Sequence, residues 1–213
     1  MKTLLSRVLV LVLLLPMLAM VAGCDNRAKE VTAADDAYDA ALDTMNGPAA
    51  AAWLSKESVA RLESMLEIAR KGKKAEVQAL GMSDRLEVLR MRLLLKGDIN
   101  KPLDGRGYYA KVVSSGWVTS TSDMKRVKVQ VEPSKTRATV MYKSPYQVEG
   151  VMGYWVFEDG AWKEDQVLDR QMQDASLRTA AQEERKSEND YLLWVLGEQL
   201  EMKIPATVWD PPR

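Results

Sequence analysis

Two adjacent carboxylates, Glu164 and Asp165, follow a run of aromatic side chains and are the groups best placed for acid–base chemistry. An acid buried among aromatic rings loses the solvation of its charged form, which raises its pKa towards a range useful for proton transfer. Such a reaction also needs a donor for the developing oxyanion, and the Tyr154 hydroxyl is the nearest candidate. The chain has no His, which removes the usual neutral-pH general base. These three residues form the catalytic alternative, while a protein without catalysis is the leading hypothesis.

Aromatic side chains gather in one part of the chain: nine of the fourteen lie between residues 108 and 162. Tyr and Trp combine a flat apolar surface with a polar tip, which suits them to orient a ligand. Four of them are candidate ligand-binding residues: Tyr142, Tyr154, Trp155 and Trp162. The alternative is that aromatic residues favour strands and fill the core of a small sheet.

Composition excludes several classes of partner. The chain has 30 Lys plus Arg and 30 Asp plus Glu, so its net charge gives no reason to expect nucleic acid. The absence of His and the single Cys leave no metal-ligand cluster, and no glycine-rich phosphate loop follows a strand. We therefore expect no metal and no cofactor.

Two basic clusters suggest surface contacts. The first, Arg70, Lys71, Lys73 and Lys74, is suited to anionic lipid headgroups, or alternatively forms a solvated helix end. The second makes a predicted hairpin cationic, which can equally protect an exposed strand edge from pairing; it comprises Lys125, Arg126, Lys128, Lys135 and Arg137.

The first 23 residues predict a secretory signal. Lys2 and Arg7 precede sixteen uncharged residues, which as a helix span only about 24 Å against a hydrocarbon core of roughly 30 Å. The run Val21-Ala22-Gly23-Cys24 resembles the lipobox of bacterial lipoproteins. That resemblance implies that Cys24 is acylated and becomes the first residue of the mature chain. Asp25 resembles the signal that retains enterobacterial lipoproteins in the inner membrane.

The rest of the sequence predicts helices, then a sheet, then helices. After a lipidated tether over 24–31, one helix is predicted from a Thr32 cap to Asn46-Gly47-Pro48, with Ala34, Tyr38, Ala41, Leu42 and Met45 as its buried stripe. A second helix is predicted from a Ser55 cap to Gly72, and a third from Ser83 to Gly97. Helical spacing returns from Leu168 as a C-terminal extension over 168–213.

Two hairpins are predicted between these helical parts. Val127, Val129 and Val131 alternate with polar residues, and Ala138, Val140 and Tyr142 alternate on the return strand. The Asp159-Gly160 pair predicts a type I′ turn. Counting outward from it pairs Tyr154 with Asp165 and places Trp155, Phe157, Trp162 and Glu164 on one face.

This arrangement is similar to the nuclear-transport-factor-2-like superfamily over residues 32–167, on the strength of the helix start Trp53-Leu54-Ser55-Lys56-Glu57-Ser58 and the hairpin from Tyr154 to Lys163. The resemblance implies an α+β fold, with N-terminal helices packed on a curved antiparallel sheet to form an open cone. The C-terminal extension departs from that pattern and either covers the mouth of the cone or forms a dimer surface. The superfamily includes both enzymes and binding proteins, so the fold does not define the function.

The leading hypothesis is a lipid-anchored protein of the bacterial envelope, on the periplasmic face of the inner membrane, that binds a small ligand or an envelope protein without catalysis. One alternative is a small-molecule isomerase or lyase that uses Glu164 or Asp165 with Tyr154. Another is a structural, assembly or immunity-type lipoprotein. The sequence leaves the oligomeric state open.

Overall fold

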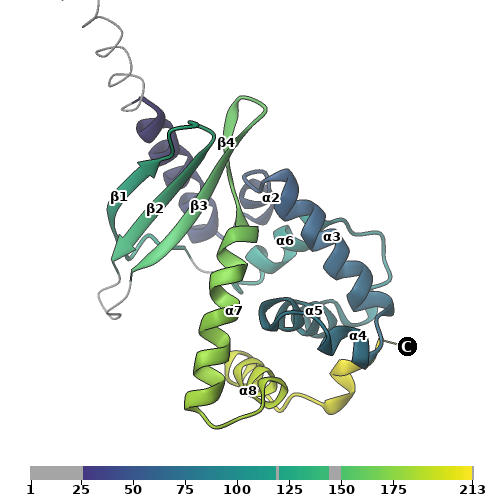
Figure 1. Cartoon of the computed structure of the whole chain (residues 1–213). Helices are drawn as coiled ribbons and strands as arrows, with labels where there is room; N and C mark the ends of the chain where they lie inside the picture. The colour runs from purple at the N-terminus through teal and green to yellow at the C-terminus, as the bar shows by residue number, and fades with distance from the viewer. Residues whose placement is uncertain (1–25, 119, 144–149, 213) are drawn as a thin grey trace, which may run out of the picture.

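A curved, open four-stranded antiparallel sheet and a set of helices make up the protein, which confirms the predicted α+β class (Figure 1). The computed structural model describes residues 26–118, 120–143 and 150–212. The predicted signal segment 1–23 and Cys24 lie outside the described residues. The sheet and the helix behind it occupy one end of the molecule, and most of the other helices pack at the other end (Figure 1).

The described chain begins in a helix over 26–43. The remaining helices are α2 (Gly47–Ala51), α3 (Lys56–Lys71), α4 (Lys74–Gln78), α5 (Met82–Leu95), η1 (Lys96–Asp98), α6 (Gly105–Ser114), α7 (Gln166–Glu183), α8 (Glu188–Leu200) and η2 (Ala206–Trp209).

The sheet is a meander of β1 (Lys125–Val131), β2 (Arg137–Lys143), β3 (Val151–Glu158) and β4 (Ala161–Glu164) in the order β1-β2-β3-β4. The predicted register of the second hairpin is confirmed, because Trp155 pairs with Glu164 and Phe157 pairs with Trp162. Asp159 and Gly160 have φ values of 50° and 83°, as a type I′ turn requires.

The first hairpin differs from the prediction at one residue. A β-bulge between Arg126 and Lys128 shifts the register and leaves Val127 51% exposed instead of half-buried. The return strand follows the prediction, since Ala138, Val140 and Tyr142 are all buried.

The predicted start of the first helix at Thr32 is wrong, because the chain is already helical at residue 26. Arg27 forms an ion pair with Glu30 and stacks on Phe157, and Val31 is fully buried, so these residues belong to the packed helix rather than to a tether. The helix ends at residue 43, which leaves Met45 56% exposed. Asn46 then caps α2 by accepting a hydrogen bond from the Ala49 backbone.

Other helix boundaries follow the prediction more closely. The Ser55 side chain caps α3 as expected, and the helix ends at Gly72. α5 begins one residue before Ser83 and is followed by a single 3₁₀ turn at Gly97. α6, whose capping residue is Asp104, was not predicted from the sequence.

The 26–43 helix lies across one face of the sheet (Figure 1). The Tyr38 ring meets the Trp155 ring edge-on, with ring centroids 6.1 Å apart. Nearer the start of the helix, the Trp162 indole donates a hydrogen bond to Glu30. This face of the sheet is therefore covered by the N-terminal helix.

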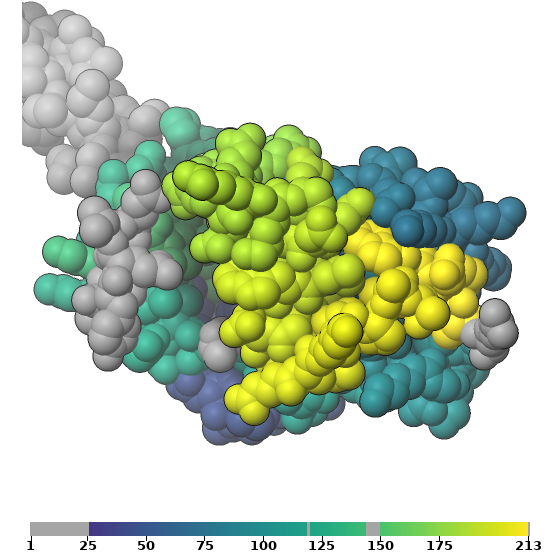
Figure 2. All heavy atoms as spheres, turned by 90° about the horizontal axis from the view of Figure 1, so that it is seen from below, coloured from purple at the N-terminus to yellow at the C-terminus, as the bar shows by residue number. Residues whose placement is uncertain are grey.

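The C-terminal helices form part of the same body. α7 packs against α3, α5 and β3, and α8 packs against α5 and α7. α7 and α8 form one continuous surface, and the chain after α8 runs beside it towards the helices of the N-terminal half (Figure 2).

Arg92 joins three of these segments. Its guanidinium, on α5, donates hydrogen bonds to the carbonyls of Ile68, Ala69 and Gly72 at the end of α3 and to Val208 of the tail. The side chain is almost fully buried, and it supplies hydrogen bonds to the carbonyls of Ala69, Gly72 and Val208, whereas the Ile68 carbonyl also accepts from the Gly72 N–H.

We expect Arg92→Met to lower the free energy of unfolding by about 3 kcal/mol, because it leaves several buried carbonyls unsatisfied. Urea unfolding followed by circular dichroism measures this change. Arg178→Met is the matched control, since Arg178 is 53% exposed, and it is expected to change the stability by less than about 0.5 kcal/mol. Equal stabilities for the two variants would contradict this role of Arg92.

Candidate functional site

A partly enclosed cavity of about 670 Å³ lies between the sheet and the helices. Its wall is built by the 26–43 helix, by α3, α5, α6 and α7, and by β2, β3 and β4. A cavity of this size is large enough for a small organic molecule. The side chains that line it are both aromatic and charged.

Glu164 enters this cavity from the junction of β4 and α7. Its backbone N–H donates to the Trp53 carbonyl (2.8 Å), and its carbonyl accepts from the Ser55 N–H (2.9 Å). On the other side, Glu164 pairs with Trp155 of β3. Because the backbone is held on both sides, the side chain points to the same face of the sheet as Trp155.

One oxygen of the Glu164 carboxyl lacks a hydrogen-bond partner among the described residues. Its Oε2 is inaccessible to solvent and has no hydrogen-bond partner within the described part of the chain. Burial raises the pKa of Glu164 well above its usual value, and the neighbouring charges of Asp169 and Asp165 raise it further. Arg170 and the Gln166 amide act in the opposite direction but do not outweigh the burial.

Two tyrosines lie near this carboxyl. The hydroxyls of Tyr38, on the first helix, and Tyr109, on α6, are hydrogen-bonded to each other. Burial raises the pKa of both phenols, and the charge of Glu164 raises it further. The site therefore combines an acid that favours its protonated form with two neutral hydroxyls.

A second acid, Asp35, lines the cavity from the first helix but is fully paired. It accepts hydrogen bonds from Tyr142 and from Arg126, whose Nε lies 2.9 Å away. Burial still raises the pKa of Asp35 above its usual value, although these two partners act to lower it. Arg126 also binds Asp36, so this member of the basic hairpin is already engaged within the chain.

The third acid, Glu87 of α5, lies in an ion cluster at the helical end of the cavity. It accepts a hydrogen bond from Tyr108 (2.6 Å) and forms ion pairs with Arg170 (3.0 Å) and Arg90 (3.4 Å). Burial alone would raise its pKa, but Arg170, Arg90 and the Tyr108 hydroxyl together lower the pKa of Glu87 to about 2. Glu87 is therefore charged and neutralised.

The structure brings together some of the residues singled out in the sequence. Glu164, Trp155 and Tyr142 line the cavity, and so does Tyr154. Tyr154 nevertheless alternates with Trp155 along β3, and its hydroxyl lies 3.8 Å from the Met152 sulfur rather than on Glu164.

The other two candidates have structural roles. The Asp165 side chain caps α7 by accepting from the Val167 N–H, and its backbone N–H pairs with the Tyr154 carbonyl as the predicted register requires. Trp162 packs edge-on against Phe157 at the far end of the same sheet face and does not line the cavity.

Several site residues were not identified from the sequence, among them Asp35 and Tyr38 on the first helix, Tyr109 on α6, and Gln166 and Asp169 on α7. One signal was present: Asp35, Tyr38 and Leu42 recur at helical spacing, so a carboxylate lies on the apolar stripe of the helix. An acid on such a stripe is buried and needs a partner.

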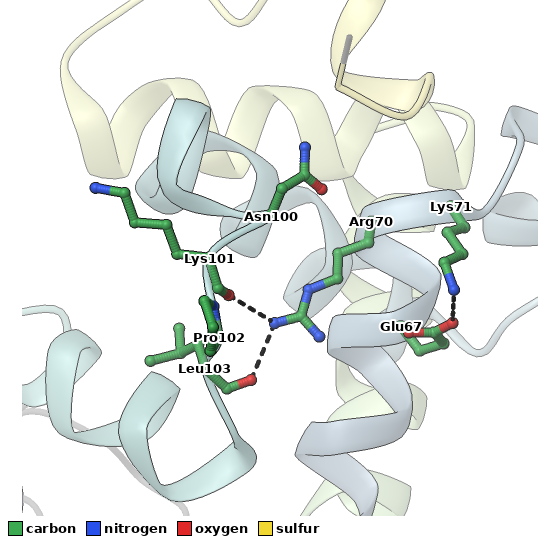
Figure 3. A pocket seen from close by; sticks show the side chains of 7 residues that line it. All are labelled: Glu67, Arg70, Lys71, Asn100, Lys101, Pro102 and Leu103. Carbon is green, nitrogen blue, oxygen red and sulfur yellow. Dashed lines mark hydrogen bonds and ion pairs between the residues drawn. The ribbon is translucent and has the colours of Figure 1, made fainter.

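A second, shallower pocket lies at the first basic cluster (Figure 3). Arg70 donates to the carbonyls of Ile99 (2.8 Å) and Leu103 (2.9 Å), and Lys71 pairs with Glu67 (2.6 Å). Arg70 is therefore committed to holding the loop before α6. Whether the cluster meets lipid headgroups stays a prediction.

Two kinds of feature are absent from the described residues: a group of metal-ligating side chains and a helix that could span a membrane. Within residues 26–118, 120–143 and 150–212, no three or more His, Cys, Asp or Glu residues are grouped to hold a metal ion. In the same part of the chain, no helix combines the length and the apolar character needed to cross a membrane.

Comparison with known proteins gives no relative: no protein-family model, no curated protein and no solved structure matches this chain. The function must therefore be argued from the site itself.

The Glu87 cluster predicts a specific dependence of stability on pH. Its pKa is about 2 in the folded chain and about 4.5 in an unfolded chain. The stabilisation is therefore complete above about pH 4.5 and is lost as the pH falls towards about 2. We expect Glu87→Gln to lower the free energy of unfolding by about 3 kcal/mol at pH 7, because Arg170 loses its buried partner.

Urea unfolding of both proteins between about pH 2 and pH 7 tests this prediction, since the difference should shrink as the pH falls through this window. Glu132→Gln is the control at an exposed position. A difference between Glu87→Gln and the wild type that does not vary with pH would contradict the low pKa.

Proposed function

We propose that this chain is a membrane-anchored lipoprotein of the bacterial envelope that binds a small, partly apolar molecule in the cavity between its sheet and helices. The observation that carries the binding proposal is the cavity of about 670 Å³ with the unpaired Oε2 of Glu164 at its edge. Oε2 is itself closed to solvent, but the Glu164 side chain is partly exposed, so a ligand that brings a donor or a positive charge beside it offsets the cost of burying this carboxyl. The lipobox-like run before Cys24 supports the anchor.

The anchor would be close in the chain to the first helix, which lines the cavity. Only Asp25 separates Cys24 from residue 26, where the first helix is already formed. Two or three acyl chains hold a lipoprotein stably on a bilayer, whereas one gives only marginal attachment. This geometry favours a ligand taken up near the membrane surface, on the periplasmic face of the inner membrane.

The anchor predicts that Cys24→Ser abolishes the incorporation of labelled palmitate and releases the protein from the membrane fraction. Both are measured in a bacterium that processes lipoproteins, by metabolic labelling and by detergent phase partitioning. Lys29→Gln serves as a control that leaves the cysteine intact. Palmitate that remains in Cys24→Ser would remove the anchor from the proposal.

The cavity can be blocked at Gly153 of β3, which lines it. A Cβ built at this position lies 3.7 Å from Trp155 Nε1 and from the Tyr142 ring, so Ala fits at ordinary contact distance. A larger side chain on the same face occupies the cavity itself. Gly153→Leu and Gly153→Ala therefore form a matched pair.

We expect native mass spectrometry of the detergent-solubilised full chain to show a bound small molecule in the wild type and in Gly153→Ala. We expect Gly153→Leu to lose at least about nine-tenths of it, because blocking a binding site removes most of its binding free energy. Circular dichroism confirms that both variants are folded. An equal amount of bound molecule in the three proteins would place the ligand elsewhere.

A second candidate function, proton transfer on the bound molecule, is favoured by one observation: Glu164 prefers its protonated form beside the hydroxyls of Tyr38 and Tyr109. A protonated acid can donate its proton to one position of a substrate and regain a proton from another, and a neutral phenol can donate a hydrogen bond to a substrate oxygen on which negative charge develops. In this case the bound material is a mixture of substrate and product that Glu164→Gln no longer interconverts.

A further inference from the structure

We propose that the cavity selects a small organic cation, a substituted ammonium whose charge lies between Glu164 and Asp169 and whose apolar part meets the aromatic wall. This inference rests on the proposed binding function and adds the class of ligand. It starts from the distribution of charge around the cavity.

Acidic side chains outnumber basic ones on the described cavity wall, where five carboxylates face two guanidinium groups: Asp35, Asp39, Glu87, Glu164 and Asp169 against Arg90 and Arg170. Both guanidinium groups are directed to the same acid, Glu87. Asp35 forms an ion pair with Arg126, which does not line the cavity. The positive charge is thus concentrated at two of the five acids.

Within the described part of the chain, the hydrogen bonds of the remaining acids come from neutral donors. Asp39 accepts from the N–H and hydroxyl of Thr121, at 3.1 and 2.7 Å. Asp169 accepts from the Gln173 amide at 2.5 Å. Glu164 Oε2 accepts no hydrogen bond from the described residues. A ligand that brings a positive charge to this end of the cavity would therefore compensate acids that have no cation of their own in the described chain.

Glu164 and Asp169 are the two acids of the described wall beside which positive charge is lacking. They lie at the end of β4 and in the first turn of α7, and the charge of Asp169 disfavours that of Glu164. Arg170 is the nearest cation, but its guanidinium bonds to Glu87 and approaches the Ser83 carbonyl. A ligand ammonium between the two acids relieves both their burial and their repulsion.

The rest of the wall suits an alkylated cation better than a metal ion. Tyr38, Tyr109, Tyr142 and Trp155 line the cavity beside these acids. The faces of aromatic rings attract cations, and aromatic walls with a carboxylate are typical of sites for substituted ammonium groups. A bare metal ion requires several oxygen ligands around one point, and no such cluster is present in the described residues.

The test uses two probes that differ mainly in charge. Benzyltrimethylammonium carries a permanent positive charge, and 2-methyl-1-phenylpropan-2-ol has nearly the same shape with a hydroxylated carbon in place of the nitrogen. Binding to the detergent-solubilised full chain is measured by isothermal titration calorimetry. Gly153→Leu, with its cavity filled, corrects for uptake of either probe by the detergent.

We expect the wild type to bind the cation at least about tenfold more tightly than the alcohol, as for an interaction with a charged group. Glu164→Gln and Asp169→Asn should each remove most of this preference while the alcohol binds as before. Glu132→Gln, an exposed acid outside the wall, should leave it unchanged.

The same titration reports the protonation of Glu164. Its carboxyl lies near Tyr38 of the first helix, Tyr109 of α6, Asp165 at the cap of α7, and Asp169 and Arg170 within α7, while Glu87 and Arg90 of α5 also line the cavity. A cation beside Glu164 favours its charged form and lowers its pKa, so binding releases a proton at any pH between the midpoints of the bound and the free protein. The measured enthalpy should then depend on the ionisation enthalpy of the buffer, and Glu164→Gln should abolish that dependence.

Equal affinities for the two probes, both lost in Gly153→Leu, would overturn the cation selectivity and leave the binding cavity supported. A cation affinity that survives Gly153→Leu would overturn the proposed place of binding for this ligand. If the wild type binds neither probe while a neutral or anionic molecule copurifies with it, the ligand class is wrong and the binding function stands.

Discussion

The structure depends on the way in which the sheet passes into α7. β4 ends at Glu164, whose backbone is hydrogen-bonded to Trp53 and Ser55 on one side and whose strand pairs with β3 on the other. Gln166 then starts α7, and its N–H donates to the Ser58 hydroxyl. This junction fixes the face of the sheet from which the Glu164 side chain projects. A carboxyl group is therefore held by backbone hydrogen bonds beside the aromatic and charged side chains of the cavity.

The cavity is the consequence of that constraint. The N-terminal helix covers the sheet at Tyr38, α7 leads away from the junction, and both line the cavity that remains between the sheet and the helices. The protein neutralises most of the acids that this packing buries: Glu87 obtains two arginines, and Asp35 obtains Arg126. Among the described residues, no arginine forms an ion pair with Glu164, although the charge of Arg170 acts on it. Because compensated acids are the rule inside proteins, an uncompensated one at a cavity is a functional candidate.

The sequence was sufficient for those features that local physics controls. The Asp159-Gly160 turn determined the β3–β4 register, and that register correctly placed Glu164 on the face of Trp155. The partners of Glu164 could not be predicted in the same way, because Tyr38 and Tyr109 are more than fifty residues away and reach it only through tertiary packing. α6 was missed because its sequence, with Gly at both the first and third positions, has low intrinsic helix propensity. Packing of Tyr108 and Tyr109 stabilises it instead.

The titration of the Glu164 carboxyl is the most direct test of this account. Carbon-13 NMR of the side-chain carboxyl in the solubilised full chain, assigned by the signal that disappears in Glu164→Gln, gives its midpoint without reference to any ligand. We expect the midpoint of this titration to lie well above the usual value near 4.5, because burial and the neighbouring acids raise the pKa of Glu164. A midpoint at or below that value would mean that the carboxyl is solvated or paired, and would contradict the site described for it.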